Sequence, residues 1–236
     1  MSITPGSEKP MSRSRLADSL TVAGLVLLGI VPAFFGSVRL RQVAGGIATP
    51  DNTRFLAMPW PVTVHIVGAV LFALPGAFQF SAQLRRRQMQ WHRLAGWVLV
   101  PCGFAVSLTG LWMTQFYPRV DFDGVAVYWE RMAVGVAMTV SLWQGISSVR
   151  RHDIPAHRAW MMRAYALGMG AGTQVFTHIP LIIVPSLRSE LSRAICMGAA
   201  WAINALVAEY FIQRSLQTKA AGIQGMPALS RPVAVP

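Results

Sequence analysis

The sequence contains 236 residues, of which 53% are hydrophobic and only 13% are charged. Soluble domains carry roughly 25% charged residues, so this composition excludes an ordinary soluble domain and indicates an integral membrane protein. The formal net charge of +12 does not indicate nucleic-acid binding, because the Lys and Arg residues occur in short clusters between apolar runs.

Six apolar runs are each long enough to cross a hydrocarbon core as an α-helix, which takes about 20 residues. In chain order they cover residues 19–38, 60–84, 94–116, 125–149, 159–184 and 191–213. The runs are too long for barrel strands and lack the alternation of period two that such strands show. The sequence therefore predicts an all-α protein, with a bundle of six transmembrane helices in residues 19–213.

The loops between these runs predict the orientation of the bundle. Thirteen Lys and Arg residues flank the runs on one side and six on the other. Basic residues concentrate on the cytoplasmic side of membrane proteins, so both termini are expected in the cytoplasm of a bacterium, with the bundle in the inner membrane. Residues 1–18 and 214–236 lack apolar periodicity and are predicted to be flexible cytoplasmic tails.

Four ionisable side chains are predicted to share one layer near the outer surface. With a rise of 1.5 Å per helical residue, His65 of the second run, Glu130 and Arg131 of the fourth and His178 of the fifth lie at similar depths. Ionisable groups are costly in lipid, so their clustering indicates either a functional site or a structural polar network.

Two histidines from different helices at one depth are suited to bind haem b, because each neutral imidazole can supply one axial nitrogen to the iron. We therefore predict His65 and His178 as axial ligands. Arg131, or Arg54 of the outer loop, would face the haem propionates, and Glu130 would adjust the local charge. The same residues are also consistent with a hydrogen-bonded network or with a path for protons or solutes.

A second, weaker candidate site lies at the cytoplasmic helix starts. The stretches WHRLAGW and AHRAWMM place His92 and His157 at equal depth, and Arg163 follows one turn or so deeper. A His-Arg pair at such a position is also typical of an interface anchor. Arg163 and Glu209 are expected to form an ion pair between the fifth and sixth runs.

The stretches VTVHIVGAVLFALPGAFQF, RRRQMQWHRLAGW and HDIPAHRAWMMRAYAL carry a family resemblance over about residues 60–210. They resemble a family of uncharacterised bacterial predicted membrane proteins, which implies the helical fold and no particular chemistry. A looser likeness is to the cytochrome b561 and ferric-reductase group, whose helical bundles bind haem through inward-facing histidines.

These observations lead to a working hypothesis and two alternatives. The hypothesis is a multi-pass membrane protein that binds haem b and passes electrons, with a quinone or another redox partner in the lipid bilayer and with homo-oligomers allowed. The alternatives are a proton-coupled or small-solute transporter and a non-catalytic membrane scaffold. Whether the protein is an enzyme is left open by the sequence.

Overall fold

The computed structural model describes residues 13–49 and 52–224, and side chains within residues 15–49 and 52–218. This part of the chain is almost entirely helical and contains no strand. Its elements are α1 (Arg13–Ala44), α2 (Thr53–Ala57), α3 (Pro59–Ala77), η1 (Phe78–Phe80), α4 (Ala82–Arg87), α5 (Met89–Phe116), α6 (Val125–Arg150), α7 (Ile154–Gly168), α8 (Gly170–Thr177), α9 (Ile179–Ile183), η2 (Pro185–Leu187) and α10 (Glu190–Gln224).

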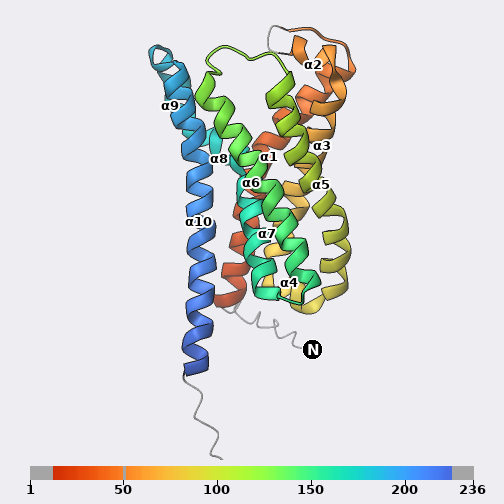
Figure 1. Ribbon diagram of the computed structural model, residues 1–236, viewed down its shortest axis with the longest axis vertical. Coiled ribbons are helices and arrows are strands. Elements are labelled where there is room, and N and C mark those ends of the chain that lie inside the picture. Colours follow the sequence, from red (N-terminus) through yellow and green to blue (C-terminus); the bar gives the residue numbers. More distant parts are fainter. Residues whose placement is uncertain (1–12, 50–51, 225–236) are drawn as a thin grey trace, which may run out of the picture.

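The long helices run up and down one axis (Figure 1). The short helices α2 and α9 lie at one end of the bundle, which we call the α2 end. The short helix α4 lies at the other, which we call the α4 end. Helix α1 begins and α10 ends at the α4 end, so both ends of the described chain lie on one side of the bundle.

Among the described residues, five helices are long and apolar enough to cross a membrane, namely α1, α3 with η1, α5, α6 and α10. Their outer surfaces agree with contact to lipid, since large apolar side chains such as Leu94 and Trp97 are 69% and 80% exposed. A surface with this much exposed apolar area is unfavourable in water and favourable in a bilayer.

The predicted fifth span, residues 159–184, is not a single helix and corrects the expected count of six continuous spans. The chain breaks after Gly168 and again at His178, which divides the run into α7, α8 and α9. Together the three pieces lead from the end of α6 at the α4 end back to the start of α10 at the α2 end (Figure 1).

Close helix contacts at glycines explain the first of these breaks. A Cβ atom at Gly172 would collide with the backbone carbonyl of Leu28 in α1, and one at Gly170 would collide with Trp201 in α10. Helix α8 can therefore approach both neighbours only because these positions lack side chains. At the second break, Pro180 lies in the first turn of α9, where a missing N–H costs little.

Other boundaries differ by smaller amounts. The predicted second span, residues 60–84, ends as a regular α-helix at Ala77, continues as η1 and turns into α4 after Ser81. The Ser81 hydroxyl accepts a hydrogen bond from the Leu84 N–H and so caps α4. Helices α1 and α10 extend into the segments 1–18 and 214–236, and the remainder of those predicted tails, residues 1–12 and 225–236, lies outside the described residues.

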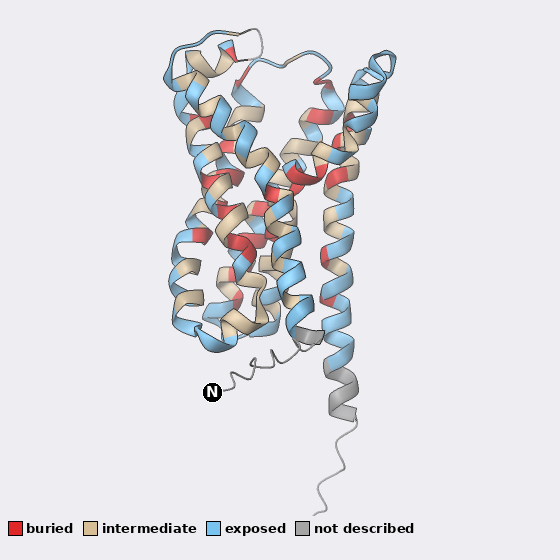
Figure 2. Cartoon of the chain, turned by 180° about the vertical axis from the view of Figure 1, so that it is seen from behind, coloured by how far each residue is buried: buried red, intermediate tan, exposed pale blue. Residues whose placement is uncertain are grey.

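Helices α3, α5, α6 and α7 form a four-helix arrangement around the main core. Both α3 and α6 pack against α5 and against α7, so α5 and α7 occupy opposite corners. Helix α1 packs on α3 and α8, and α10 packs on α6, α7 and α8. The buried residues concentrate in the middle of this arrangement, whereas much of α10 is exposed (Figure 2).

The core is held together by aromatic rings against glycines. The Phe72 ring lies where a Cβ of Gly103 would be, and the Tyr165 ring lies in the same way over Gly76. The Tyr165 hydroxyl donates a hydrogen bond to the Ala73 carbonyl oxygen at 2.7 Å, which ties α7 to α3. These contacts fix how the helices are rotated about their axes, and therefore which polar side chains face inward.

Candidate functional site

The predicted outer layer divides into separate groups in the structure. His65 projects from α3 toward α5, where its Nδ1 lies 3.0 Å from the Val106 carbonyl oxygen and 3.1 Å from the Thr109 hydroxyl. A carbonyl oxygen can only accept, so Nδ1 carries the proton and Nε2 is left as the free nitrogen of the neutral ring.

His178 lies elsewhere, between α8 and α9. Its Nδ1 lies 3.0 Å from the Gln174 carbonyl oxygen, and its ring borders a cavity at the α2 end that Phe122 and Arg193 also line. Helix α3 packs on α1, α5 and α7, whereas α8 packs on α1, α7 and α10. The structure therefore places His65 and His178 against different neighbours and does not bring them together as a pair.

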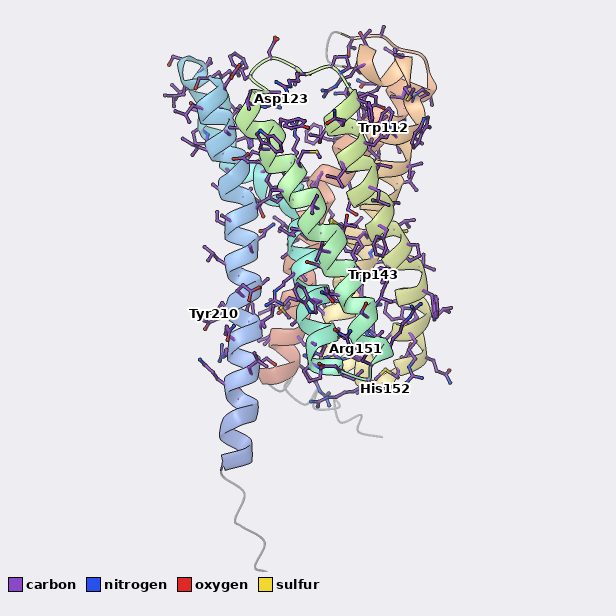
Figure 3. The ribbon with its side chains drawn as sticks, in the orientation of Figure 1. Trp112, Asp123, Trp143, Arg151, His152 and Tyr210 are labelled. Atoms are coloured by element: carbon purple, nitrogen blue, oxygen red, sulfur yellow. The ribbon has the colours of Figure 1, made fainter. Side chains whose placement is uncertain are left out.

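Arg131 belongs to an ion-pair network at the α2 end. Its two terminal nitrogens donate to the two carboxylate oxygens of Asp123 at 2.6 and 3.2 Å. The Arg193 Nε of α10 donates to the same carboxylate at 2.7 Å. The Asp123 side chain is only 3% exposed, whereas those of Arg131 and Arg193 are 30% exposed. Figure 3 labels Asp123 in the loop that precedes α6.

Glu130 of α6 packs against α10 and makes no ion pair with this network among the described residues. A Cβ atom at Gly198 would lie only 2.7 Å from Glu130 Oε1, so the carboxylate packs directly against the α10 backbone. Its other oxygen, Oε2, is buried and has no hydrogen-bond partner among the described residues. An unpartnered carboxylate oxygen inside a bundle is costly and is a candidate for proton uptake.

The second predicted site is brought together in part at the α4 end. His92 lies two helical turns before the buried Leu99 of α5, and His157 lies two turns before the buried Ala164 of α7, so each histidine continues the inward face of its helix. His92 is close enough to His157 and to Arg85 for their charges to interact. We call His92, His157, Arg85 and Arg158 the α4-end cluster.

Each member of the α4-end cluster is positioned by its own element. The His157 Nδ1 donates to the Gly145 carbonyl oxygen of α6 at 2.9 Å, which leaves Nε2 free. Arg85 of α4 donates to the Gln79 carbonyl oxygen at 3.3 Å. Burial lowers the pKa of Arg85, and the nearby positive charge of Arg158 lowers it as well. A guanidinium nevertheless stays charged at neutral pH, so the cluster is strongly cationic.

The carboxylate whose charge acts on Arg85 is that of Asp18, and it is hydrogen-bonded to the start of α4. Asp18 of α1 accepts hydrogen bonds from the Ser81 hydroxyl at 2.6 Å and from the Ala82 and Gln83 N–H groups at 2.8 and 3.1 Å. It thereby holds the start of α4 against α1. Asp18 keeps its negative charge in these hydrogen bonds and acts on Arg85 through space, without a direct ion pair among the described residues.

Arg163 is not a member of the α4-end cluster, although the sequence grouped it with His92 and His157. Its guanidinium pairs with Glu209 of α10, with Nε to Oε1 at 2.5 Å and Nη2 to Oε2 at 3.0 Å. It also lies over the Trp160 ring, 4.6 Å from the ring centre. The expected ion pair between Arg163 and Glu209 is therefore present, and it separates Arg163 from the histidines.

Asp123, Arg193 and Arg85 are site residues that the sequence did not predict, because each of them stands among loop charges. The available signal was a single Asp directly before the glycine that precedes a span, which is weak. Within the described residues, no three His, Cys, Asp or Glu side chains come together as a metal site.

A set of long apolar helices with lipid-exposed outer faces and ionisable groups between them defines an α-helical membrane protein. Residues 62–212 match the family model described as "Predicted membrane protein (DUF2306)", and the chain belongs to this family. This confirms the family resemblance drawn from the His65, His92 and His157 stretches. No curated protein and no solved structure matches the chain, so the likeness to cytochrome b561 and ferric reductases has no support.

Proposed function

We propose that this protein is a b-type haem-binding electron-transfer protein of the bacterial inner membrane, with the haem held between His92 and His157 at the α4 end. The observation that carries the proposal is that His92 and His157, on helices at opposite corners of the four-helix arrangement, lie at the same end and near enough for the charge of one ring to act on the other. Cofactor sites in helical bundles are built in this way, from inward side chains on facing helices.

The donor set fits such a cofactor. A ligating histidine usually donates its second ring N–H to a carbonyl or carboxylate, which orients the ring, and His157 does so toward Gly145. Arg85 and Arg158 supply positive charge for two propionates, which guanidinium groups pair with well. Haem iron contributes one-electron chemistry, while the chain holds the rings, neutralises the propionates and shields the site with apolar helices.

The outer histidines fit the iron less well as a pair. His65 and His178 each keep Nδ1 on a backbone carbonyl and so have a free Nε2, but they face different neighbours. The proposal therefore assigns iron ligation to His92 and His157 and leaves His65 and His178 with other roles.

An absorption spectrum tests the haem proposal. Protein purified in detergent after expression with a haem precursor is expected to show a b-type α band in the reduced-minus-oxidised difference spectrum. His92→Ala and His157→Ala should each abolish the band, whereas His65→Ala and His178→Ala should keep it. A colourless wild-type protein would reject the proposal, and loss of the band only in the His65 and His178 variants would move the site to the α2 end.

The orientation belongs to the same proposal. We place the α4 end and both termini in the cytoplasm, α7–α9 as a sixth crossing, and a quinol in the bilayer as electron donor. The basic residues Arg85, Arg86, Arg87, Arg150 and Arg151 at the α4 end support this orientation. Reporter enzymes fused after Arg151 and after Pro118 should be active on opposite sides of the membrane, and the same side for both would contradict it.

A second candidate function, proton-coupled transport, is favoured by Glu130 alone. Its buried, unpartnered Oε2 is the kind of group that takes up and releases protons inside a bundle. Proton flux into liposomes should fall at least tenfold in Glu130→Gln if this function holds, since the amide cannot titrate. Glu190→Gln, which neutralises an exposed carboxylate at the α2 end, is the matched control, and equal flux in both variants would count against transport.

A further inference from the structure

A cavity of about 270 Å³ opens at the α2 end, beside the start of α10. The polar part of its lining consists of His178, Arg188, Ser189 and Arg193. These residues come from the α8–α9 junction, the segment after η2 and the first turn of α10, so the cavity joins three elements that are neighbours at this end of the bundle.

The two arginines of the cavity are oriented but not saturated. Arg188 donates its Nε to the Leu181 carbonyl oxygen at 2.9 Å, and Arg193 donates its Nε to Asp123 at 2.7 Å. In each case the side-chain hydrogen bonds found among the described residues use only Nε. The terminal nitrogens, which form the fork suited to phosphate and carboxylate, are thus available.

The described lining contains no carboxylate that could neutralise these groups. Asp123, the nearest acid, already accepts hydrogen bonds from Arg131 and Arg193. Glu190 lies over Gly124, where a Cβ atom would collide with its carboxylate. Of these two acids, Asp123 is thus held by arginines, and Glu190 is exposed and packs over Gly124 outside the lining.

Further positive charge stands behind the cavity. Arg54 of α2 is close enough to interact with the charges of Arg39, Arg131 and Arg193. It donates Nη1 to the Pro118 carbonyl oxygen at 3.1 Å, and its Nε is buried without a partner among the described residues. Arg131 and Arg193 thus pair with Asp123, and the charges of Arg54 and Arg39 add to a positive field that attracts anions.

The rest of the lining is apolar, with Phe122, Leu181 and Ile182. An apolar wall beside two guanidinium forks suits an anion attached to a hydrocarbon body. In the orientation proposed above, this end of the bundle reaches the headgroups of one leaflet. Both features favour a phosphate group over a small hydrophilic cation or a neutral solute.

We propose that the cavity beside α10 binds a phosphate-type anion, through the forks of Arg188 and Arg193 with help from His178. Such a group can be carried by an anionic phospholipid in the leaflet at the α2 end, or can arrive as free phosphate. The proposal does not depend on haem binding, because it concerns other residues at the opposite end of the bundle.

Calorimetric titration of the full-length protein in detergent tests the proposal with two probes, inorganic phosphate and short-chain phosphatidylglycerol. Arg188→Gln should weaken binding about tenfold, since it removes one charge-assisted contact. The affinity of Arg188→Lys should lie between those of the wild type and Arg188→Gln, because lysine keeps the charge and loses the two-pronged geometry of the guanidinium. Arg119→Gln is the matched control: it removes an exposed charge at the same end, which lies over the Tyr128 ring and outside the cavity.

The two probes distinguish the sources of the anion. Binding of phosphatidylglycerol alone indicates a lipid headgroup, and binding of phosphate alone indicates a soluble anion; both outcomes support the site if Arg188→Gln weakens them. Should Arg188→Gln fail to fold, His178→Gln, which also alters the lining, is expected to show the same weakening. Absence of binding by the wild type, or equal binding in the Arg188 and Arg119 variants, would overturn the proposal.

Discussion

The two ends of the bundle handle charge in opposite ways. At the α2 end, Asp123 is buried and its oxygens are shared between Arg131 and Arg193, so the loop before α6, helix α6 and helix α10 are tied together. At the α4 end, His92 lies near His157 and Arg85, and the nearby Asp18 accepts hydrogen bonds from the start of α4. In the first arrangement the carboxylate forms direct ion pairs with two arginines, whereas in the second the nearby carboxylate forms none among the described residues.

This difference separates structural from functional polarity. Removing one partner of a buried ion pair lowers the free energy of unfolding by a large amount, because the remaining charge is then left without a partner. A cationic cluster without direct ion pairs adds little to stability and is suited to another role, such as holding a cofactor. The comparison therefore predicts large stability effects at Asp123 and small ones at the histidines.

Asp123→Asn should produce the largest loss of stability. It leaves two half-buried guanidinium groups without their carboxylate, which costs about 3–5 kcal/mol when a buried pair is broken. The free energy of unfolding, measured by denaturant titration in detergent, gives the value. Asp121→Asn is the control, since this side chain in the same loop is exposed and should change stability by less than about 0.5 kcal/mol. Similar losses in both variants would show that loop charge alone matters.

Gly172→Ala should be the next largest effect, and it tests whether the middle of the bundle holds the two ends in place. The added Cβ meets the Leu28 backbone, which cannot move aside as a side chain can, so α8 must shift from α1. Overpacking of this kind costs about 1–3 kcal/mol. Gly24→Ala in α1 is the matched control, because its Cβ would meet nothing within 4 Å, and it should stabilise by up to about 1 kcal/mol.

The ion pair between Arg163 and Glu209 should give a smaller effect. Both side chains are partly exposed, at 29% and 41%, so the interaction is screened more than that of Asp123. A double-mutant cycle with Arg163→Gln and Glu209→Gln is expected to return a coupling energy of about 1 kcal/mol. A coupling energy as large as the loss of stability in Asp123→Asn would contradict this prediction, since solvent screening would then not weaken the Arg163–Glu209 pair.

His92→Ala should have the smallest effect on stability and still abolish the haem band. Its side chain makes no hydrogen bond among the described residues, so the apoprotein should lose less than about 1 kcal/mol. The comparison is measured on protein expressed without haem precursor, by the same unfolding titration. A loss comparable to that of Asp123→Asn would assign His92 to the structural network and weaken the functional reading of the α4 end.

Most of the helices could be predicted from the sequence because they depend on local composition. The predicted run 125–149 corresponds to α6, Val125–Arg150, and the run 94–116 lies within α5, Met89–Phe116. The fifth run was wrong as a continuous span, since its break depends on Leu28 and Trp201, which are far away in sequence. Hydropathy carries no information about such neighbours.

The sequence predicted the depth of each candidate site residue in the membrane but not the neighbour that its side chain faces. Counting residues placed His65 with His178 and His92 with His157 at matching levels, but depth says nothing about which neighbour a side chain faces. Only the second pair lies near enough for the charge of one ring to act on the other. Arg163, assigned to that pair by sequence, turns instead to Glu209.

The sequence by itself determined that this chain is a helical membrane protein, because the length and apolarity of each run are local quantities that a bilayer selects directly. The tertiary structure alone decided which ionisable groups become partners. Those partnerships depend on how each helix is rotated about its axis, and the rotation is set by contacts such as Phe72 on Gly103 and Tyr165 on Gly76, which join residues from different helices.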